Sequence, residues 1–461
     1  MKKTAYDVVV LGGGAGGVPA AIRAAQLGGR AAVIEEKHLG GLCMNRGCVP
    51  FGQMMVASRF LSHFSLAEEM GIKAAKVSTD LSALLKRQDE LVSFMRQGVL
   101  GMLNKNKVDL IRGQGRLTGP GTVTVKGEAF SFKKIILATG SHWLEPDFPG
   151  CDLPEVVNSD YLLSAKKLPP RCLLFGNNPH LIEMAQFLHH FGSRVWLATP
   201  EKALLSRENK TIRTRLAKAL QSQGLTVLTA AEIQSLKRKK DGVQARLKTK
   251  GKEETVTVDL VLTVRRQARL EGLGLEPVGL DGKADFIQVN ERMETGVEGV
   301  YAIGDVAAPE ERHYSHLASS GGVVAAENAM GKDRTLDQKT VVRVVYTHPQ
   351  VACVGLTSRE AKQAGYDVVT GSAPLSMNPF GMITAQSEGL VEVMADKKYG
   401  EILGAQMIGH GAAEMVGQGV LAIQMEATLD ELARAPFPHP TLSESVAEAA
   451  RDALGWPLYL P

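Results

Sequence analysis

The chain has 461 residues, enough for about three or four domains of ordinary size. Its formal net charge of +4 is too small to indicate a nucleic-acid partner, because no stretch combines dense lysine or arginine with interleaved aromatic residues. No apolar run approaches the ~20 residues that span a bilayer, and an odd number of cysteines, five, does not fit a secreted disulfide framework, so we expect a cytoplasmic protein that binds neither nucleic acid nor membrane.

The first predicted elements follow the order of a dinucleotide-binding unit. Residues 6–11 are a short apolar β-type run, a glycine-rich turn follows, and residues 18–27 have a helical pattern. A second strand over residues 31–34 ends in Glu35. This order of strand, turn, helix and strand, with an acid at its end, predicts a Rossmann-type nucleotide-binding domain at the start of the chain.

The turn contains a three-glycine fingerprint, Gly12-x-Gly14-x-x-Gly17. The first glycine permits a tight turn, the second lets the backbone approach a pyrophosphate, and the third lets the helix pack close to the strand. The helix N-terminus adds partial positive charge for the phosphates, and Glu35 is placed to accept hydrogen bonds from a ribose. A glycine-rich turn alone would be a weak signal. In this setting nucleotide binding is favoured, with FAD and NAD both open.

Residues 40–50 read Gly-Gly-Leu-Cys-Met-Asn-Arg-Gly-Cys-Val-Pro, with cysteines at Cys43 and Cys48. Five residues of regular helix rise ~7.5 Å, whereas a disulfide needs Cα atoms within about 7 Å of each other. A bond between the two cysteines would therefore need an irregular turn, which Gly41 and Gly47 permit. The proline that closes the segment is tolerated in the first turn of a helix.

Two buried structural thiols, or half of a metal site, are the alternative interpretations of this pair. No second Cys/His pair stands at ligand spacing, so we predict no metal site. A cysteine pair just downstream of a nucleotide fingerprint, in a chain expected to be cytoplasmic, is more typical of redox chemistry. The remaining cysteines have no partner pattern and are expected to be ordinary buried residues: Cys151, Cys172 and Cys353.

Two later strands end in turns that help to distinguish an FAD site from an NAD site. The first turn is Thr139-Gly140 and the second is Gly304-Asp305. A Gly-Asp pair at a strand end can bring a carboxylate onto a polyol such as the ribityl chain of a flavin. Each turn alone would mean little, but in series with the first unit they favour FAD.

The pattern of strand, turn, helix and strand recurs between residues 171 and 198. The same number of positions separates Gly12 from Glu35 and Gly176 from Thr199. This is an internal duplication of a nucleotide-binding domain. After about residue 340 the pattern changes to a separate α+β module, two copies of which could pair face to face. Its strands are expected at residues 341–346, 390–394 and 402–408, and its helices at residues 413–426 and 443–454.

Together these motifs resemble the flavoprotein disulfide reductases, the class I pyridine nucleotide-disulfide oxidoreductases. That family includes dihydrolipoamide dehydrogenase, glutathione reductase and mercuric reductase. The cysteine segment is the most specific motif, and the resemblance extends through residues 346–349, 354–357 and 402–404, so that it covers the chain nearly end to end. The sequence Thr-Leu-Ser-Glu at residues 441–444 most resembles that of the dihydrolipoamide dehydrogenase branch.

The resemblance implies an α/β fold with two Rossmann-like dinucleotide-binding domains, of FAD and NAD type, and a C-terminal α+β dimerisation domain. It also implies a homodimer whose active site is shared between subunits. The expected domains are an FAD-binding domain with the redox cysteine pair (residues 1–150), a degenerate NAD-binding-type domain (residues 151–272), a continuation of the FAD-binding domain (residues 273–340) and the dimerisation domain (residues 341–461).

The resemblance further implies which residues act. A dithiol, dihydrolipoamide or a lipoyl-carrying protein, attacks the Cys43–Cys48 disulfide at Cys43, the interchange thiol. His439 takes up the substrate proton while Glu444 holds the imidazole, and Cys48 becomes the thiolate that passes electrons to the flavin. Taken without the resemblance, the segment around His439 could be a turn before a helix capped by Ser443. The implied FAD-binding residues are Gly12, Gly14, Gly17, Glu35, Thr139, Gly140, Gly304 and Asp305.

The usual last step of the family, transfer of a hydride to NAD, is where this sequence departs. Asn178 and Leu181 stand where the second nucleotide turn should have its second and third glycines, and Thr199 replaces the ribose-binding acid. A side chain at the second position obstructs the approach of phosphate, and Leu181 should hold the helix away from the strand.

Other departures concern the same function. Residues 265–269, Arg-Arg-Gln-Ala-Arg, lack the glycine and proline of the family's Gly-Arg-x-Pro-Asn-like stretch. Phe51 and Gly52 replace a Ser-Lys pair, so that Glu183 lacks its usual lysine partner. On the thiol side, Phe437 replaces the first His of the family's His-x-His-Pro. Tolerated drift in an NAD enzyme is one interpretation. We favour the other, an enzyme that exchanges electrons with a partner other than NAD(H), because several changes fall on one function.

Two further functions stand as alternatives. One is a reductase of another disulfide or of mercuric ion, although mercuric reductases often have a vicinal C-terminal cysteine pair that residues 455–461 lack. The other is a non-enzymatic flavoprotein subunit that binds lipoyl domains. The presence of both cysteines together with His439 and Glu444 argues against this second alternative.

Overall fold

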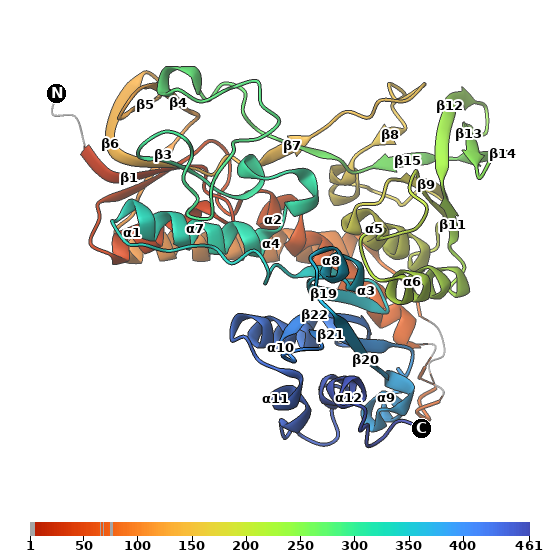
Figure 1. The fold of residues 1–461 in the computed structure, drawn as a ribbon. Coiled ribbons are helices and arrows are strands. Elements are labelled where there is room, and N and C mark those ends of the chain that lie inside the picture. Colours follow the sequence, from red (N-terminus) through yellow and green to blue (C-terminus); the bar gives the residue numbers. More distant parts are fainter. Residues whose placement is uncertain (1–4, 65, 68, 74–76) are drawn as a thin grey trace. The chain divides into compact units, whose positions relative to one another are not determined.

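The structure is a computed structural model that describes residues 5–64, 66–67, 69–73 and 77–461. The chain divides into two compact units (Figure 1). The first comprises Met1–Gln53, Asp80–Glu145 and Arg265–Leu336, and the second comprises Met54–Thr79, Pro146–Val264 and Asp337–Pro461. Across the described ranges, no helix is long and apolar enough to cross a membrane.

A seven-stranded sheet forms the centre of the first unit. Its middle strand β1 (Ala5–Leu11) lies between two parallel neighbours, β2 (Ala31–Glu35) and β6 (Glu128–Leu137). Alternate side chains of β1 over residues 8–11 enter two different cores, so both faces of this part of the strand are buried and its sequence is a continuous apolar run. The other strands are β3 (Asp109–Arg112) beside β2, β5 (Thr122–Val125) and β4 (Gly115–Gly119) beyond β6, and β17 (Val300–Ala302), which also pairs with β6.

Helices cover this sheet, and two of them pack closely. α1 (Gly17–Gln26) follows the glycine-rich turn and contacts α7 (Ser315–Ala329). A Cβ on Gly322 of α7 would lie 2.4 Å from the Gly16 carbonyl oxygen, so this approach requires glycine. The unit also contains α2 (Gly41–Arg46), the start of α3 (Cys48–Phe64), α4 (Leu81–Lys105), the strand pair β7 (Ser141–Trp143) and β16 (Arg266–Ala268), and the 3-10 turns η2 (Glu276–Val278), η3 (Gly304–Ala307) and η4 (Glu310–Arg312).

The second unit confirms the predicted duplication. In it, β9 (Arg171–Phe175), α5 (Pro179–His190) and β10 (Arg194–Thr199) repeat β1, α1 and β2. β9 lies between the parallel strands β10 and β15 (Leu260–Thr263), just as β1 lies between β2 and β6. The remaining elements of this part are β8 (Val156–Val157), η1 (Ser159–Leu163), α6 (Lys210–Ser222), β11 (Thr226–Thr229) and the antiparallel strands β12 (Ala231–Lys239), β13 (Gly242–Thr249) and β14 (Lys252–Val258).

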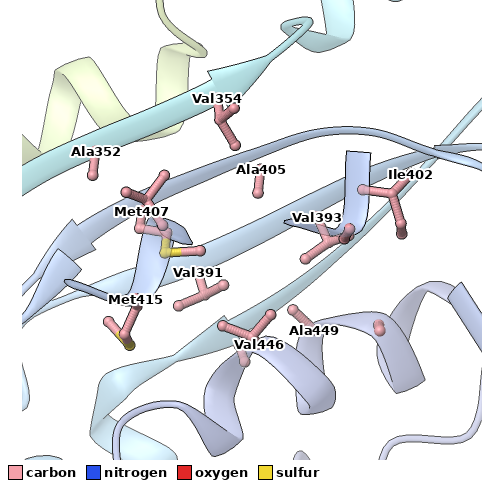
Figure 2. Close-up of a cluster of buried hydrophobic side chains, with 14 of the residues drawn as sticks. Ala352, Val354, Val391, Val393, Ile402, Ala405, Met407, Met415, Val446 and Ala449 are labelled. Atoms are coloured by element: carbon pink, nitrogen blue, oxygen red, sulfur yellow. The ribbon is translucent and has the colours of Figure 1, made fainter. Parts of the chain in front are cut away.

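The C-terminal part of the second unit has the predicted α+β character. A five-stranded sheet in the order β18-β19-β22-β21-β20 packs against helices through an apolar core, in which Met407 lies near Met415 and Val391 near Val446 (Figure 2). The elements are β18 (Arg343–Val345), β19 (Gln350–Gly355), α8 (Ser358–Gln363), β20 (Val368–Pro374), η5 (Leu375–Met377), α9 (Pro379–Ile383), β21 (Leu390–Asp396), β22 (Ile402–Gly409), α10 (Ala412–Gln424), α11 (Leu429–Arg434) and α12 (Glu444–Ala453).

Candidate functional site

The turn between β1 and α1 has the geometry that its glycines predict. Gly12 has a φ of +112°, and a Cβ there would lie 2.3 Å from the Ala138 carbonyl oxygen. A Cβ on Gly17 would lie 1.9 Å from the Gly12 carbonyl oxygen, so α1 packs this close only without a side chain. The nearest atom to a Cβ on Gly14 would be the Gly41 Cα, at 3.7 Å. Protein packing therefore does not require glycine at position 14, which fits a backbone that a ligand approaches.

A cavity of about 500 Å³ lies over this turn, a volume typical of cofactor sites. Its walls bring together the glycine turn, Glu35, Thr139-Gly140 and Gly304-Asp305. Gly17 is the predicted cofactor residue outside the lining, because it packs α1 against β1. The α1 N-terminus can hold a pyrophosphate, and carboxylates stand where sugar hydroxyls would need acceptors. The residues present therefore fit FAD.

Glu35 is held at the wall of the cavity by backbone groups. Its Oε2 accepts a hydrogen bond from the Gly13 N–H at 2.7 Å, and its Oε1 accepts one from the Lys37 N–H at 2.7 Å. Both bonds fix the carboxylate at the end of β2, where the sequence placed the ribose-binding acid.

Asp305 has two partners that the sequence did not indicate for this site. Arg266 Nη1 donates to Asp305 Oδ2 at 2.8 Å, and the Ser141 hydroxyl donates to the same oxygen at 2.6 Å. Arg266 reaches the cavity because β16 pairs with β7. Arg269 also lines the cavity and donates to Glu36 at 2.7 Å. In the sequence these arginines were visible only as part of a degraded NAD motif.

The two cysteines lie on different helices. α2 ends at Arg46, Gly47 has a φ of −134° and a ψ of −117°, and α3 begins at Cys48. A Cβ on Gly47 would lie 3.2 Å from the Cys43 Cα, so glycine allows the two helical turns to approach. The irregular turn predicted between the cysteines is confirmed.

Asn45 fixes the position of this turn. Its side-chain amide donates to the carbonyl oxygens of Leu39 at 3.0 Å and Gly41 at 2.7 Å, and its Oδ1 accepts a hydrogen bond from Arg96 of α4. The asparagine between the two cysteines therefore holds the loop that brings Cys43 to the cavity.

Both cysteines of the pair are thiols in this structure. A hydrogen bond to Cys48, followed by burial, raises the pKa of Cys43 well above the usual range of a thiol. Cys48 Sγ lies 3.3 Å from the hydroxyl of Ser315, the first residue of α7. Cys43 and Ser315 line the cavity beside the glycine turn. The sequence did not indicate Ser315, because it is remote in the chain and belongs to none of the recognised motifs.

The remaining cysteines are separate from this site. Cys172 and Cys353 are buried as expected, and burial raises the pKa of Cys172 to about 12. Cys151 is partly exposed, so the expectation of burial was wrong for this residue, which lies in a turn rather than in a core strand. In the part of the chain that the structure describes, no group of three or more His, Cys, Asp or Glu side chains is arranged to hold a metal ion.

His439 and Glu444 form a hydrogen-bonded pair within one chain. His439 Nδ1 lies 3.0 Å from Glu444 Oε1, and Glu444 Oε2 accepts a hydrogen bond from the Thr441 N–H at 2.9 Å. The imidazole is 67% exposed, and with Nδ1 held by the carboxylate, Nε2 is the nitrogen left for proton transfer. Ser443 occupies the N-cap position of α12 but makes no capping bond, since its hydroxyl accepts from Gln418 at 2.7 Å.

The N-terminus of α5, in the second nucleotide-type domain, satisfies its own hydrogen-bond donors. Pro179 at the first helical position has no N–H. The Asn178 side chain accepts a hydrogen bond from the His180 N–H at 3.0 Å, and the Asn178 carbonyl accepts one from the Leu181 N–H at 3.0 Å. In a nucleotide-binding helix these donors would face phosphate. This helix start does not fit the pyrophosphate of NAD.

The neighbouring positions are also occupied by the protein itself. Leu181 is fully buried, and its Cδ2 would lie 3.2 Å from a Cβ on Gly176, so it fills the space between helix and turn. Thr199, in place of the ribose acid, is fully buried and accepts a hydrogen bond from the Glu201 N–H at 3.2 Å. Neither residue offers a group to a ribose.

Glu183, which lacks the family's lysine partner, binds backbone instead. Its Oε1 accepts a hydrogen bond from the Tyr346 N–H at 2.8 Å. One turn further along α5, Gln186 accepts from the His348 N–H at 2.7 Å and donates to the His348 carbonyl at 2.6 Å. α5 thus uses both side chains to hold the segment that precedes β19.

Comparisons with known proteins agree with this arrangement. Residues 6–332 match the family model described as pyridine nucleotide-disulphide oxidoreductase, and residues 341–450 match its dimerisation domain. A dihydrolipoyl dehydrogenase of Thermus scotoductus is 40% identical over 451 residues, which are 96% of each chain. One of Bacillus subtilis is 33% identical over 471 residues, covering 98% of each chain. Among solved structures, a Cu(II) complex of the HOCl-induced flavoprotein disulfide reductase RclA from Escherichia coli has the same fold, with a TM-score of 0.85 at 24% identity over 98% of this chain and 99% of that one.

Proposed function

Since this chain belongs to the pyridine nucleotide-disulphide oxidoreductase family, whose members are FAD-dependent enzymes that act on sulfur groups, we propose that it oxidises a dihydrolipoyl group through Cys43 and Cys48. The observation on which this rests is that Cys43 lines the same cavity as the glycine turn of the first nucleotide unit. The dihydrolipoyl dehydrogenases of Thermus scotoductus and Bacillus subtilis, similar over nearly the whole chain, support the choice of dithiol.

The cysteine pair reacts in its disulfide form by thiol exchange. One substrate sulfur bonds to Cys43 while Cys48 leaves as a thiolate, and the second substrate sulfur then displaces Cys43. The substrate becomes a cyclic disulfide, and the cysteine pair holds the two electrons and becomes a dithiol. FAD, when bound in the cavity, is the oxidant that restores the disulfide.

The pair of His439 and Glu444 supplies the base for this exchange. A thiolate is the attacking nucleophile, so the substrate thiol must lose a proton. Glu444 orients the imidazole through Nδ1 and leaves Nε2 to take that proton. We place this pair beside the cysteines of a second subunit in a homodimer, which the match of residues 341–450 to a dimerisation domain supports.

The electron acceptor in this proposal is a partner other than NAD(H). Asn178 already accepts hydrogen bonds from the N–H groups at the start of α5, and Thr199 is buried. Neither position therefore offers a phosphate or ribose site of the usual kind. The cavity of the first unit keeps its glycines and acids, so the loss concerns the second nucleotide-type domain alone.

Anaerobic stopped-flow measurements test both parts of the proposal. Mixing the FAD-loaded protein with dihydrolipoamide should reduce the flavin rapidly and completely, whereas NADH and NADPH should reduce it slowly. Rapid reduction by NADH would remove the proposal on the acceptor and leave the dithiol chemistry intact. Failure of dihydrolipoamide, with rapid reduction by another dithiol, would instead favour a reductase of a different disulfide.

A further inference from the structure

Ser315 stands at a point where two features that favour a sulfur anion meet. It is the first residue of α7, a helix of 15 residues, and its hydroxyl lies 3.3 Å from Cys48 Sγ. Its side chain also lines the cavity that contains the glycine turn. The N-cap residue Tyr314 makes no side-chain capping bond, so no side chain at that position neutralises the helix N-terminus.

The hydroxyl can adapt to both protonation states of the sulfur. With a Cys48 thiol, either the sulfur or the oxygen can be the donor. With a Cys48 thiolate, the serine hydroxyl must donate, and a hydrogen bond to an ionised group is about twice as strong as one between neutral groups. The partial positive charge of a helix N-terminus favours the thiolate as well.

Cys43 strengthens the assignment of the negative charge to Cys48. Contacting thiols lose their protons one at a time. The hydrogen bond to Cys48 and burial raise the pKa of Cys43 and outweigh the lowering by the Ser315 hydroxyl, so Cys48 is favoured as the sulfur that loses the first proton. The charge then belongs on Cys48, whose Sγ lies 3.3 Å from the Ser315 hydroxyl.

We propose that Ser315 is a catalytic residue that holds Cys48 as a thiolate in the reduced enzyme, by donating its hydroxyl hydrogen to Cys48 Sγ at the N-terminus of α7. The proposal rests on the proposed function in one respect, namely that Cys48 is the sulfur that becomes a thiolate after dithiol exchange.

Other ionisable groups near these residues do not replace this role. His313 directs its Nε2 to the Ala308 carbonyl at 2.9 Å, and its Nδ1 lies 3.8 Å from Asp305. His316 follows Ser315 in α7 and stacks on Tyr314. Arg46 precedes the glycine between the cysteines and is exposed. A His316→Gln variant therefore belongs in the test, since a titrating imidazole next to Ser315 could imitate the effect.

The test is a pH titration of the reduced, FAD-loaded protein. Excess dithiothreitol under anaerobic conditions generates the reduced cysteine pair without any lipoyl substrate, and the thiolate–flavin charge-transfer absorbance reports the ionised sulfur. In Ser315→Ala the apparent pKa of this absorbance should rise by about 1 unit, since one hydrogen bond to a charged group is lost. Ser315→Thr keeps the hydroxyl and should restore the wild-type pKa. Ser320→Ala, on the exposed face of the same helix, and His316→Gln should leave it unchanged.

A second measurement does not depend on the flavin. In a Cys43→Ser background, the rate of Cys48 alkylation against pH should shift upward by the same amount when Ser315→Ala is added. Equal pKa values with and without Ser315→Ala, in the wild type by absorbance or in Cys43→Ser by alkylation, would overturn the role of Ser315. An absent charge-transfer band in the wild type, with the alkylation shift still present, would count against the proposed function and support the serine–sulfur bond.

Discussion

At the scale of single residues, Glu444 makes two contacts with different consequences. It accepts a hydrogen bond from the Thr441 N–H and holds His439 Nδ1. Glu444→Gln can keep an acceptor for the backbone but removes the negative charge that stabilises a protonated imidazole. We expect flavin reduction by dihydrolipoamide to slow by on the order of 10-fold, and by about 10²- to 10⁴-fold in His439→Gln, where the base itself is lost.

The matched control for this prediction is Glu426→Gln, an exposed carboxylate just after the end of α10. It should leave the stopped-flow rate unchanged. FAD content is measured for each variant, because the pair does not line the cofactor cavity and its loss should not release FAD. Wild-type rates in His439→Gln would show that another group takes the substrate proton.

Residues in local motifs could be predicted from the sequence, and residues that join the site through tertiary contacts could not. Cys43 and Cys48 stand five positions apart with Gly47 between them, and a bond at this spacing would need the broken helix that the structure contains. Ser315 and Arg266 reach the same cavity through α7 and through the pairing of β16 with β7. Such contacts depend on packing between segments that are distant in sequence, so no local sequence pattern predicts them.

At the scale of elements, the side chain of Asn178 stabilises the N-terminus of α5. Asn178 satisfies the His180 N–H, a role that serine, threonine, aspartate or asparagine can fill. Asn178→Ala should lower the free energy of unfolding by about 1 kcal/mol, whereas Asn178→Asp should keep most of the cap. Urea unfolding measures the difference.

The same variants test whether this helix start serves a nucleotide. Flavin reduction by dihydrolipoamide should be equal in Asn178→Ala and in the wild type, and so should the slow reduction by NADH. A much weaker NADH reaction in Asn178→Ala would show that Asn178 contacts the nucleotide and would contradict a purely structural role.

Elements with a strong apolar pattern were predictable, and those with a weak one were not. β22 is buried at every residue, β1 at most of its residues and β9 at its three central residues, and the sequence pattern predicted all three as strands. α4 gave no such signal, although it has 25 residues, because few of its positions are buried. The helix start of α5 lies earlier than the periodicity predicted, since Pro179 and Asn178 add a cap before the first apolar residue.

At the scale of the whole molecule, one buried ion pair joins parts of the second unit that are distant in sequence. Arg343 of β18 donates two hydrogen bonds to Glu208, at 2.6 and 2.9 Å, and Gln406 of β22 donates a third at 3.1 Å. Removing one partner leaves a buried charge without compensation. Arg343→Met should lower the free energy of unfolding by about 3 kcal/mol.

The double variant Glu208→Gln with Arg343→Met separates the ion pair from the volume of the side chains. It removes both charges, so it should recover a large part of the stability that Arg343→Met loses. Urea unfolding of the wild type, the single variant and the double variant decides this. Equal stability of all three would mean that the pair does not link β18 to the segment before α6.

The histidines of the second unit make its stability depend on pH. His63 stands with its ring centroid 5.3 Å from that of His348 and 6.3 Å from that of His410, and Arg59 adds positive charge to the group. Burial, then repulsion from these neighbours and from His190, lowers the pKa of His348 from 6.5 to about 4. Burial lowers the pKa of His63 and His410 in the same direction.

The sign of the effect follows from proton binding. Between pH 6.5 and 4 the unfolded chain binds a proton at His348 that the folded chain does not. His348 therefore does not reduce the free energy of unfolding above pH 6.5, and it reduces it progressively as the pH drops toward 4. The loss from this residue is at most about 3 kcal/mol.

His348→Asn should flatten the decline without abolishing it, because His63 and His410 still titrate, and His38→Asn, at an exposed position, should not change it. Urea unfolding at pH 7.5, 6, 5 and 4.5, values chosen to bracket this window, measures the slope. The lowered pKa values of carboxyl groups such as Glu360 and Asp259 add to the loss near the lower end of this range, because their ordinary pKa values are 4.5 and 3.8, so the contribution of His348 is the difference in slope between the wild type and His348→Asn. A wild-type stability that stays constant from pH 7.5 to 4.5 would therefore show that these imidazoles accept protons in the folded protein as readily as in the unfolded chain.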